Sequence, residues 1–154
     1  MEKSTKEQSV TEIEELHRRL TSLERRVRTY EEIFARLPVG LFQTSPAGRF
    51  LKANACAARI LGYDTAAELI TSVTDIGKQL YGDTAKRDEV RRILREQGAI
   101  ENLELPFDDR HGRPRWASIS ARLVRDERGD ILYHEGMIQD ITDRKAAEVE
   151  LKRA

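Results

Sequence analysis

The sequence is poor in the features that mark secreted, membrane-spanning and disulfide-stabilised proteins. Its 154 residues include one cysteine, Cys56, so no intrachain disulfide can form and a reducing compartment fits best. It contains no run of 18 or more apolar residues, so we expect no membrane span. The N-terminus is polar and acidic, unlike a signal peptide. We therefore expect a soluble, cytoplasmic protein.

The charge balance and the missing motifs exclude further classes. The 27 basic and 27 acidic residues give zero net charge, which weighs against nucleic-acid binding, because such proteins usually carry a basic surplus. The basic run 91–95 has acidic neighbours and is expected to be a solvated helix face. The sequence holds no P-loop, dinucleotide motif or nucleophile constellation, and no cluster with metal-binding spacing. We expect neither catalysis nor a metal site in this chain.

Apolar residues recur every three or four positions from residue 13 to residue 37. This spacing is a heptad repeat, which is typical of a coiled coil. A helix over 10–37 fits, because no glycine or proline occurs there before Pro38. The expected dimer-interface residues, which we call the heptad seam, are Ile13, Leu16, Leu20, Leu23, Val27, Tyr30, Phe34 and Leu37.

Charges beside the heptad seam favour a parallel homodimer. In a parallel pair Arg19 faces Glu24 of the other chain and Arg26 faces Glu31, and both contacts are attractive. An antiparallel pair sets arginine near arginine and glutamate near glutamate. Each exposed ion pair stabilises by no more than about 1 kcal/mol, so the penalty on the antiparallel pair matters most. The alternative is a single amphipathic helix that folds back on its own domain.

After Pro38 the pattern changes to that of an α+β domain. The expected strands are 39–45, 49–53, 99–109, 114–127 and 131–141. The expected helices are 54–62 with Asn54 as N-cap, 64–70 with Asp64 as N-cap, and 83–98, which follows a break at Gly82. This order predicts an antiparallel sheet with its helices gathered on one face.

Alternation along the later strands predicts which side chains share a face of the sheet. Along 114–127 one face carries Ala117, Ile119, Ala121 and Leu123. The other face carries Trp116, Ser118 and Ser120, a semi-polar stripe that we expect to meet a helix or a partner chain. Along 99–109 the same rule places Ile100 opposite Leu103, Leu105 and Phe107.

Three segments, in this order and spacing, resemble the PAS domain family over about residues 37–145. They are LPVGLFQTSPAGRFLKANACAARILGY (37–63), RHGRPRW (110–116) and YHEGMIQDITDRK (133–145). The last resembles the Asp-x-Thr junction of bacterial PAS sensor modules. The resemblance implies a five-stranded antiparallel sheet whose short helices cover one face and enclose a small pocket. It also implies a module that detects a ligand, cofactor, light or redox state, or simply dimerises, and relays the result through helices.

The resemblance divides the chain into an N-terminal coiled-coil helix (1–37), a PAS sensory domain (38–141) and the start of a C-terminal linker helix (142–154). We expect a fragment of a bacterial signal-transduction protein of the sensor histidine kinase or diguanylate cyclase type. The outgoing helix stops at Ala154 just as an amphipathic pattern (Ala147, Leu151) is starting, so a C-terminal output domain is expected to follow. That domain would supply any enzyme activity, because this chain lacks the phospho-acceptor region of a kinase and the active-site loop of a cyclase.

The last strand runs directly into helix-prone sequence. Thr142 is expected to cap the outgoing helix, and Asp143 suits the positive end of its dipole. Asp140 is expected to pair with Arg144. Asp140, Thr142 and Arg144 are therefore predicted to relay movement of the strand to the helix; the alternative is that Asp140 and Thr142 only cap it.

The cofactor stays open, although flavin and haem are not expected. In the PAS branch that forms a cysteinyl–flavin adduct, the cysteine precedes the long helix, and here that region, 75–83, has none. Cys56 lies earlier, where a small buried residue is expected. Haem-binding PAS domains of the oxygen-sensing type use a histidine of the long helix, and 83–98 has none. His134 is kept as a candidate ligand contact.

Apolar residues of the short helices and of the inner sheet face are the candidate pocket lining. The candidates are Ile60, Leu61, Ile76, Leu80, Ile93, Leu103, Ile119, His134 and Ile138. Except for His134, they are equally the residues of a filled core. A module that senses a small-molecule ligand and a ligand-free dimerisation module therefore both remain open.

Overall fold

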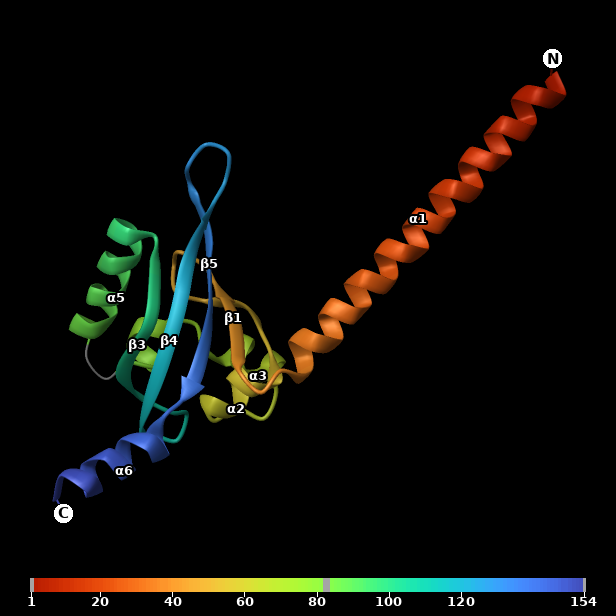
Figure 1. The fold of residues 1–154 in the computed structure, drawn as a ribbon. Helices are drawn as coiled ribbons and strands as arrows, with labels where there is room; N and C mark the ends of the chain where they lie inside the picture. The colour runs from red at the N-terminus through yellow and green to blue at the C-terminus, as the bar shows by residue number, and fades with distance from the viewer. Residues whose placement is uncertain (1, 82–83, 154) are drawn as a thin grey trace. The chain divides into compact units, whose positions relative to one another are not determined.

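The structure, a computed structural model, describes residues 2–81 and 84–153. It divides into two compact units, Met1–Ala35 and Arg36–Ala154. The first unit holds the long helix α1 (Glu2–Arg36), drawn in red and orange in Figure 1. The helix is longer than the expected segment 10–37 at its start and stops before Leu37, because a residue that precedes proline disfavours the helical conformation. No helix of the described residues is long and apolar enough to cross a membrane.

The second unit is built on one five-stranded sheet. Its strands are β1 (Gly40–Thr44), β2 (Phe50–Ala53), β3 (Ala99–Asp108), β4 (Pro114–Arg125) and β5 (Ile131–Asp140). Their order in the sheet is β2-β1-β5-β4-β3, and every neighbouring pair is antiparallel. This confirms the five-stranded antiparallel sheet expected from the sequence.

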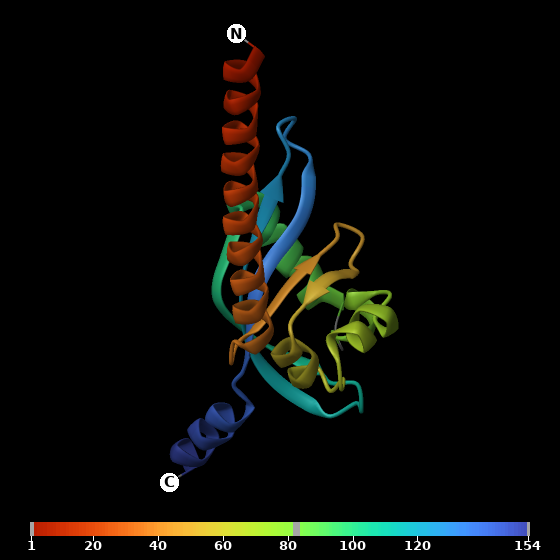
Figure 2. The same cartoon turned by 90° about the vertical axis from the view of Figure 1, so that its right-hand side faces the viewer.

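Four helices pack against one face of this sheet, and their arrangement can be followed in Figure 1 and Figure 2. They are α2 (Ala55–Ile60), α3 (Ala66–Ser72), α4 (Ile76–Gln79) and α5 (Thr84–Gln97). A last helix, α6 (Thr142–Arg153), follows β5 after a single residue. The expected start of the long helix at Asp83, and the break at Gly82, lie outside the described residues.

Asn54 connects the first strand to the first short helix. Its Oδ1 atom accepts hydrogen bonds from the backbone N–H groups of Ala57 (2.9 Å) and Leu41 (3.0 Å), and its Nδ2 donates to the carbonyl of Val39 (2.8 Å). It is therefore the N-cap that the sequence predicts. Its bonds to Leu41 and Val39 also tie the start of α2 to β1. The helix and the strand approach closely there, because a Cβ atom on Gly40 would lie only 3.0 Å from the Cα atom of Ala57.

Two local predictions were wrong, and one short helix was not predicted. Thr65, not Asp64, caps α3: its hydroxyl accepts from the backbone N–H of Glu68 at 3.1 Å. The short α4, capped by Asp75, lies in a segment where no helix was predicted. In β3 an irregularity between Ile100 and Leu103, with Asn102 at a φ of 49°, shifts the alternation. Ile100 therefore joins the buried face with Leu105 and Phe107 instead of opposing them.

The core lies between the sheet and the helices α2–α5. The expected inner face of β4 is confirmed, because Ala117 is fully buried and Ile119, Ala121 and Leu123 pack against the core. From the helices, Ala57, Ala58, Leu69, Val90 and Leu94 are buried against the same cluster. Trp116, on the outer face of β4, is 37% exposed, and its ring meets Lys145 of α6. Of the two expected neighbours, a helix or a partner chain, the structure therefore shows a helix.

Candidate functional site

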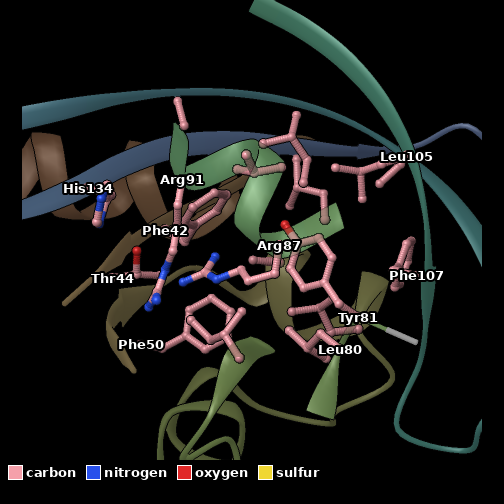
Figure 3. A pocket seen from close by; sticks show the side chains of 18 of the residues that line it. Phe42, Thr44, Phe50, Leu80, Tyr81, Arg87, Arg91, Leu105, Phe107 and His134 are labelled. Carbon is pink, nitrogen blue, oxygen red and sulfur yellow. The ribbon is translucent and has the colours of Figure 1, made fainter. Parts of the chain in front are cut away.

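A cavity of about 80 Å³ lies between the inner face of the sheet and the helices, and Figure 3 shows its lining. All five strands contribute to the wall, together with α2, α4 and α5. It is smaller than the roughly 150 Å³ cavity that holds benzene in an engineered protein core. The pocket is thus sized for a very small molecule or a few waters.

Most of the pocket wall is apolar. The inner face of the sheet contributes Phe42, Phe50, Leu105, Phe107 and Ile138, and α5 contributes Val90 and Leu94. Phe42 and Phe50 meet edge to face, with ring centroids 6.1 Å apart. These rings and aliphatic groups give a ligand a non-polar surface that excludes water.

One end of the pocket is polar and positively charged. Arg87, Arg91, Thr44 and His134 are grouped at this end in Figure 3. The guanidinium carbon of Arg87 lies 5.7 Å from the ring centroid of Tyr81, and Arg91 donates to the carbonyl of Pro46 at 3.2 Å. The Nε atom of Arg87 is buried and has no hydrogen-bond partner among the described residues.

The surroundings shift the pKa values of the groups at the polar end. Burial lowers the pKa of Arg87; Tyr81 opposes this shift and the positive charge of Arg91 adds to it. Burial also lowers the pKa of His134, and the charges of Arg87 and Arg91 act in the same direction, while a hydrogen bond to the Thr44 backbone opposes them. Burial raises the pKa of Tyr81. His134 is therefore neutral near pH 7 and faces two positive charges.

The structure brings some of the predicted pocket residues to the wall and leaves others outside it. Those in the wall are Leu61, Ile76, Leu80, Ile119, His134 and Ile138. Ile60, Ile93 and Leu103 do not line it; they are partly buried and pack against the core. Cys56 is buried in α2 and is not among the lining residues.

The charged lining residues were missed. Arg91 was expected on a solvated face, but it lies in the pocket wall beside Arg87. The helical period does carry a signal, because Arg87, Val90, Arg91 and Leu94 fall on one face of α5 at spacings of three and four. The alternation of Phe42 and Thr44 along β1 would likewise have placed both on the inner face.

The junction between β5 and α6 is a second candidate site, held by contacts to β4. The N–H of Ile141 donates to the carbonyl of Trp116 at 2.9 Å. The hydroxyl oxygen of Thr142 accepts from the N–H of Trp116 at 3.0 Å, and the Thr142 N–H donates to Asp140 Oδ1 at 2.9 Å. Thr142 therefore joins α6 to β4. The prediction that it caps the helix was wrong.

The expected Asp140–Arg144 ion pair is also wrong. Asp140 lies opposite Ala117 in the β4–β5 register, which brings its Oδ2 within 3.2 Å of the Arg115 Nη2 atom. Arg144 instead reaches Glu104 of β3, with Nη2 and Oε1 2.7 Å apart. The junction contains all three predicted relay residues, but their contacts run to the neighbouring strands.

Glu104 connects the start of α6 to β3. Its second carboxylate oxygen lies 3.1 Å from Lys145 Nζ, and Lys145 also lies 4.9 Å from the ring centroid of Trp116. The hydrogen bonds from Arg144 and Lys145 lower the pKa of Glu104, and the bond to Glu104 raises the pKa of Arg144. The first turn of α6 is thus held by β3 and β4 together.

This arrangement, an antiparallel sheet covered on one face by short helices around a small pocket, with helices at both ends of the chain, is that of sensory modules. The family model for the PAS domain matches residues 38–143, so the chain belongs to the PAS domain family. It is a PAS sensory domain as found in signalling proteins, and the domain is itself non-catalytic.

Solved structures show the same fold at low sequence identity. The PAS domain of a protein from Colwellia psychrerythraea is 19% identical, with a TM-score of 0.66 over 76% of this chain and 98% of that one. A sensory box histidine kinase/response regulator from Burkholderia thailandensis is 21% identical, with a TM-score of 0.59 over 80% and 92%. The PAS domain, in complex with ethanol, of a LuxR-family transcriptional regulator from the same organism is 16% identical, with a TM-score of 0.58 over 73% and 96%. The comparison with curated proteins gave no match.

Proposed function

We propose that this chain is the sensory and dimerisation module of a bacterial signal-transduction protein that works in the cytoplasm. Two chains pair in parallel through α1, and the state of each pocket is relayed through α6 to a C-terminal output domain. The observation that carries this proposal is the exposed heptad seam of α1 in a chain whose other unit is a PAS domain that holds a pocket.

The heptad seam requires a partner. From Ile13 to Tyr30 its side chains are 53% to 64% exposed in the single chain. A continuous apolar stripe of this length is the usual mark of an interaction surface, and the heptad spacing specifies a second helix. Among the described residues of the single chain, Arg19 pairs with Glu15 of its own helix at 2.9 Å, and both side chains are more than half exposed. In a parallel dimer, Glu24 of the second chain becomes another ion-pair partner of Arg19.

The junction contacts support a relay through α6. Because Glu104, Trp116 and Asp140 lie on three adjacent strands, a change in the twist or spacing of the sheet alters the contacts that orient α6. The inner faces of the same strands line the pocket. Occupation of the pocket is thereby coupled to the direction of the outgoing helix.

The output domain is of the sensor histidine kinase or diguanylate cyclase type. Similar folds in a two-component sensor histidine kinase and in a histidine kinase/response regulator support the kinase type. A ligand-free dimerisation module is the second candidate, and the small size of the cavity favours it. The ethanol complex of the Burkholderia regulator's PAS domain favours a ligand, since a molecule of that size suits a cavity of about 80 Å³.

Sedimentation velocity on the whole chain tests the dimer. We expect the wild-type chain to sediment as a dimer, and Leu23→Glu, which places a charge in the heptad seam, to sediment as a monomer. Ser22→Glu adds the same charge one residue away, outside the seam, and should remain a dimer. A wild-type chain that is monomeric at high concentration, or a Leu23→Glu variant that stays dimeric, contradicts the proposal.

A further inference from the structure

Two guanidinium groups converge at the polar end of the pocket. The Nη2 atoms of Arg87 and Arg91 each lie 3.6 Å from the point where a Cβ atom on Gly48 would stand. Neither arginine belongs to any ion pair formed within the described part of the chain. Asp75 acts on Arg87 only as a more distant charge, and its carboxylate caps α4.

The contacts of these arginines leave hydrogen-bonding capacity inside the pocket. Arg87 lies over the ring of Tyr81 and hydrogen-bonds with the Tyr81 side chain, but its buried Nε–H has no acceptor among the described residues. Arg91 uses one Nη2 donor on the Pro46 carbonyl, which ties α5 to the β1–β2 turn. A half-buried guanidinium without a counter-charge is unfavourable, and a carboxylate that accepts its N–H groups relieves that cost.

We propose that the pocket binds a short-chain monocarboxylate, with its carboxylate at Arg87 and Arg91 and its alkyl chain in the apolar part. This assignment rests on the sensory function proposed above and names the class of its ligand. His134 and Thr44 border the carboxylate, and Leu80, Phe107 and Ile138 border the alkyl chain.

The shape and chemistry of the wall favour a carboxylate over other anions and over neutral molecules. A cavity of about 80 Å³ is roughly half the size of the cavity that holds benzene, which limits the ligand to about two to four carbon atoms. Inorganic phosphate has no apolar group that could pack against the apolar part of the pocket wall. A neutral molecule leaves the two guanidinium groups without a negative partner.

Isothermal titration calorimetry on the whole chain tests the assignment. The probes are acetate, propionate and butyrate, with propionamide as a neutral molecule of the same shape as propionate and inorganic phosphate as an anion without a chain. We expect saturable binding of at least one of the three carboxylates, and at least ten-fold weaker binding of propionamide and of phosphate. Equal binding of propionamide, preferential binding of phosphate, or no binding of any carboxylate overturns the assignment.

Variants on one helix test whether the arginines hold the carboxylate. We expect Arg87→Gln and Arg91→Gln each to weaken carboxylate binding roughly 10- to 100-fold, the usual effect of losing a hydrogen bond to a charged group. Arg92→Gln, an exposed neighbour on α5 that does not line the pocket, should bind like the wild type. If either pocket variant unfolds, as shown by circular dichroism, the other carries the test. Equal weakening in Arg92→Gln overturns the assignment.

The oligomeric state of the same samples separates this assignment from the proposed function. A dimer that binds none of the three carboxylates refutes the ligand class and leaves the dimeric module standing. A monomer that binds a carboxylate through Arg87 and Arg91 refutes the dimer and supports the ligand class.

Discussion

Replacing Asn54 by alanine removes the side chain that joins β1 to α2. Asn54 is 2% exposed, and its amide makes hydrogen bonds to the backbone of Leu41, Ala57 and Val39. In the variant the helix loses its N-cap, which costs about 1 kcal/mol. The N–H of Leu41 and the carbonyl of Val39 also lose their partner, at about 1–3 kcal/mol each where they stay buried. We expect the free energy of unfolding to fall by about 3–7 kcal/mol, with the upper end reached only if both groups stay fully buried.

Urea unfolding, followed by the fluorescence of the single tryptophan, Trp116, measures this change in the unit that contains Asn54. All samples need the same chain concentration, because association contributes to apparent stability. Thr65→Ala is the matched control: it removes the exposed N-cap of α3 and should cost only about 1 kcal/mol. A loss in Asn54→Ala no larger than that in Thr65→Ala refutes the reasoning.

Three further changes test the pocket, the core and the junction. His134 has a lowered pKa, so the unfolded state takes up its proton first as the pH falls below about 6.5. Urea unfolding should show a loss of stability below that pH, and a smaller one in His134→Gln. Gly40→Ala places a Cβ atom 2.5 Å from the Cγ2 atom of Ile138 and should cost about 1–3 kcal/mol in the same assay. Glu104→Gln weakens the hold on α6 and should speed amide hydrogen exchange in its first turn.

Each of these predictions has a control and a contrary result. His111→Gln, an exposed histidine in the β3–β4 turn, should leave the acid loss as it is, and an identical loss in His134→Gln contradicts the pocket prediction. The control for the core prediction is Gly129→Ala, whose added Cβ meets open space, so that only the strain of its positive φ lowers stability. If Gly129→Ala lowers the free energy of unfolding by more than that strain, and as much as Gly40→Ala does, the core prediction is contradicted. Glu101→Gln, exposed on β3, should not change exchange in α6. Unchanged exchange in Glu104→Gln contradicts the junction prediction.

The sequence predicted the elements whose signals are local. Alternation in β4 identified its buried face, and the side chain of Asn54 identified the start of α2. Both depend on residues within a few positions of each other, so no knowledge of the tertiary fold was needed. The heptad seam was read in the same way, but its partner lies outside a single chain, and parallel pairing stays a prediction.

The errors arose where distant segments decide the outcome. The irregularity at Asn102 reverses the expected face of Ile100, and alternation alone does not reveal an inserted residue. Asp140 pairs with Arg115 because the β4–β5 register places them together, whereas the sequence suggested a neighbour four residues away. The two arginines at the polar end of the pocket were missed because Arg87 and Arg91 read as ordinary exposed residues of a charged helix until the fold brings them to His134 and Thr44.

Disulfide cross-linking tests the parallel pairing of α1 most directly. In a Cys56→Ala background, Leu16→Cys places one thiol in the heptad seam near the start of the repeat. In a parallel dimer the two introduced thiols face each other within bonding distance, and mild oxidation should join nearly all chains into covalent dimers. Ser22→Cys, outside the seam, should give few. A Leu16→Cys chain that stays uncross-linked while it sediments as a dimer would contradict parallel pairing.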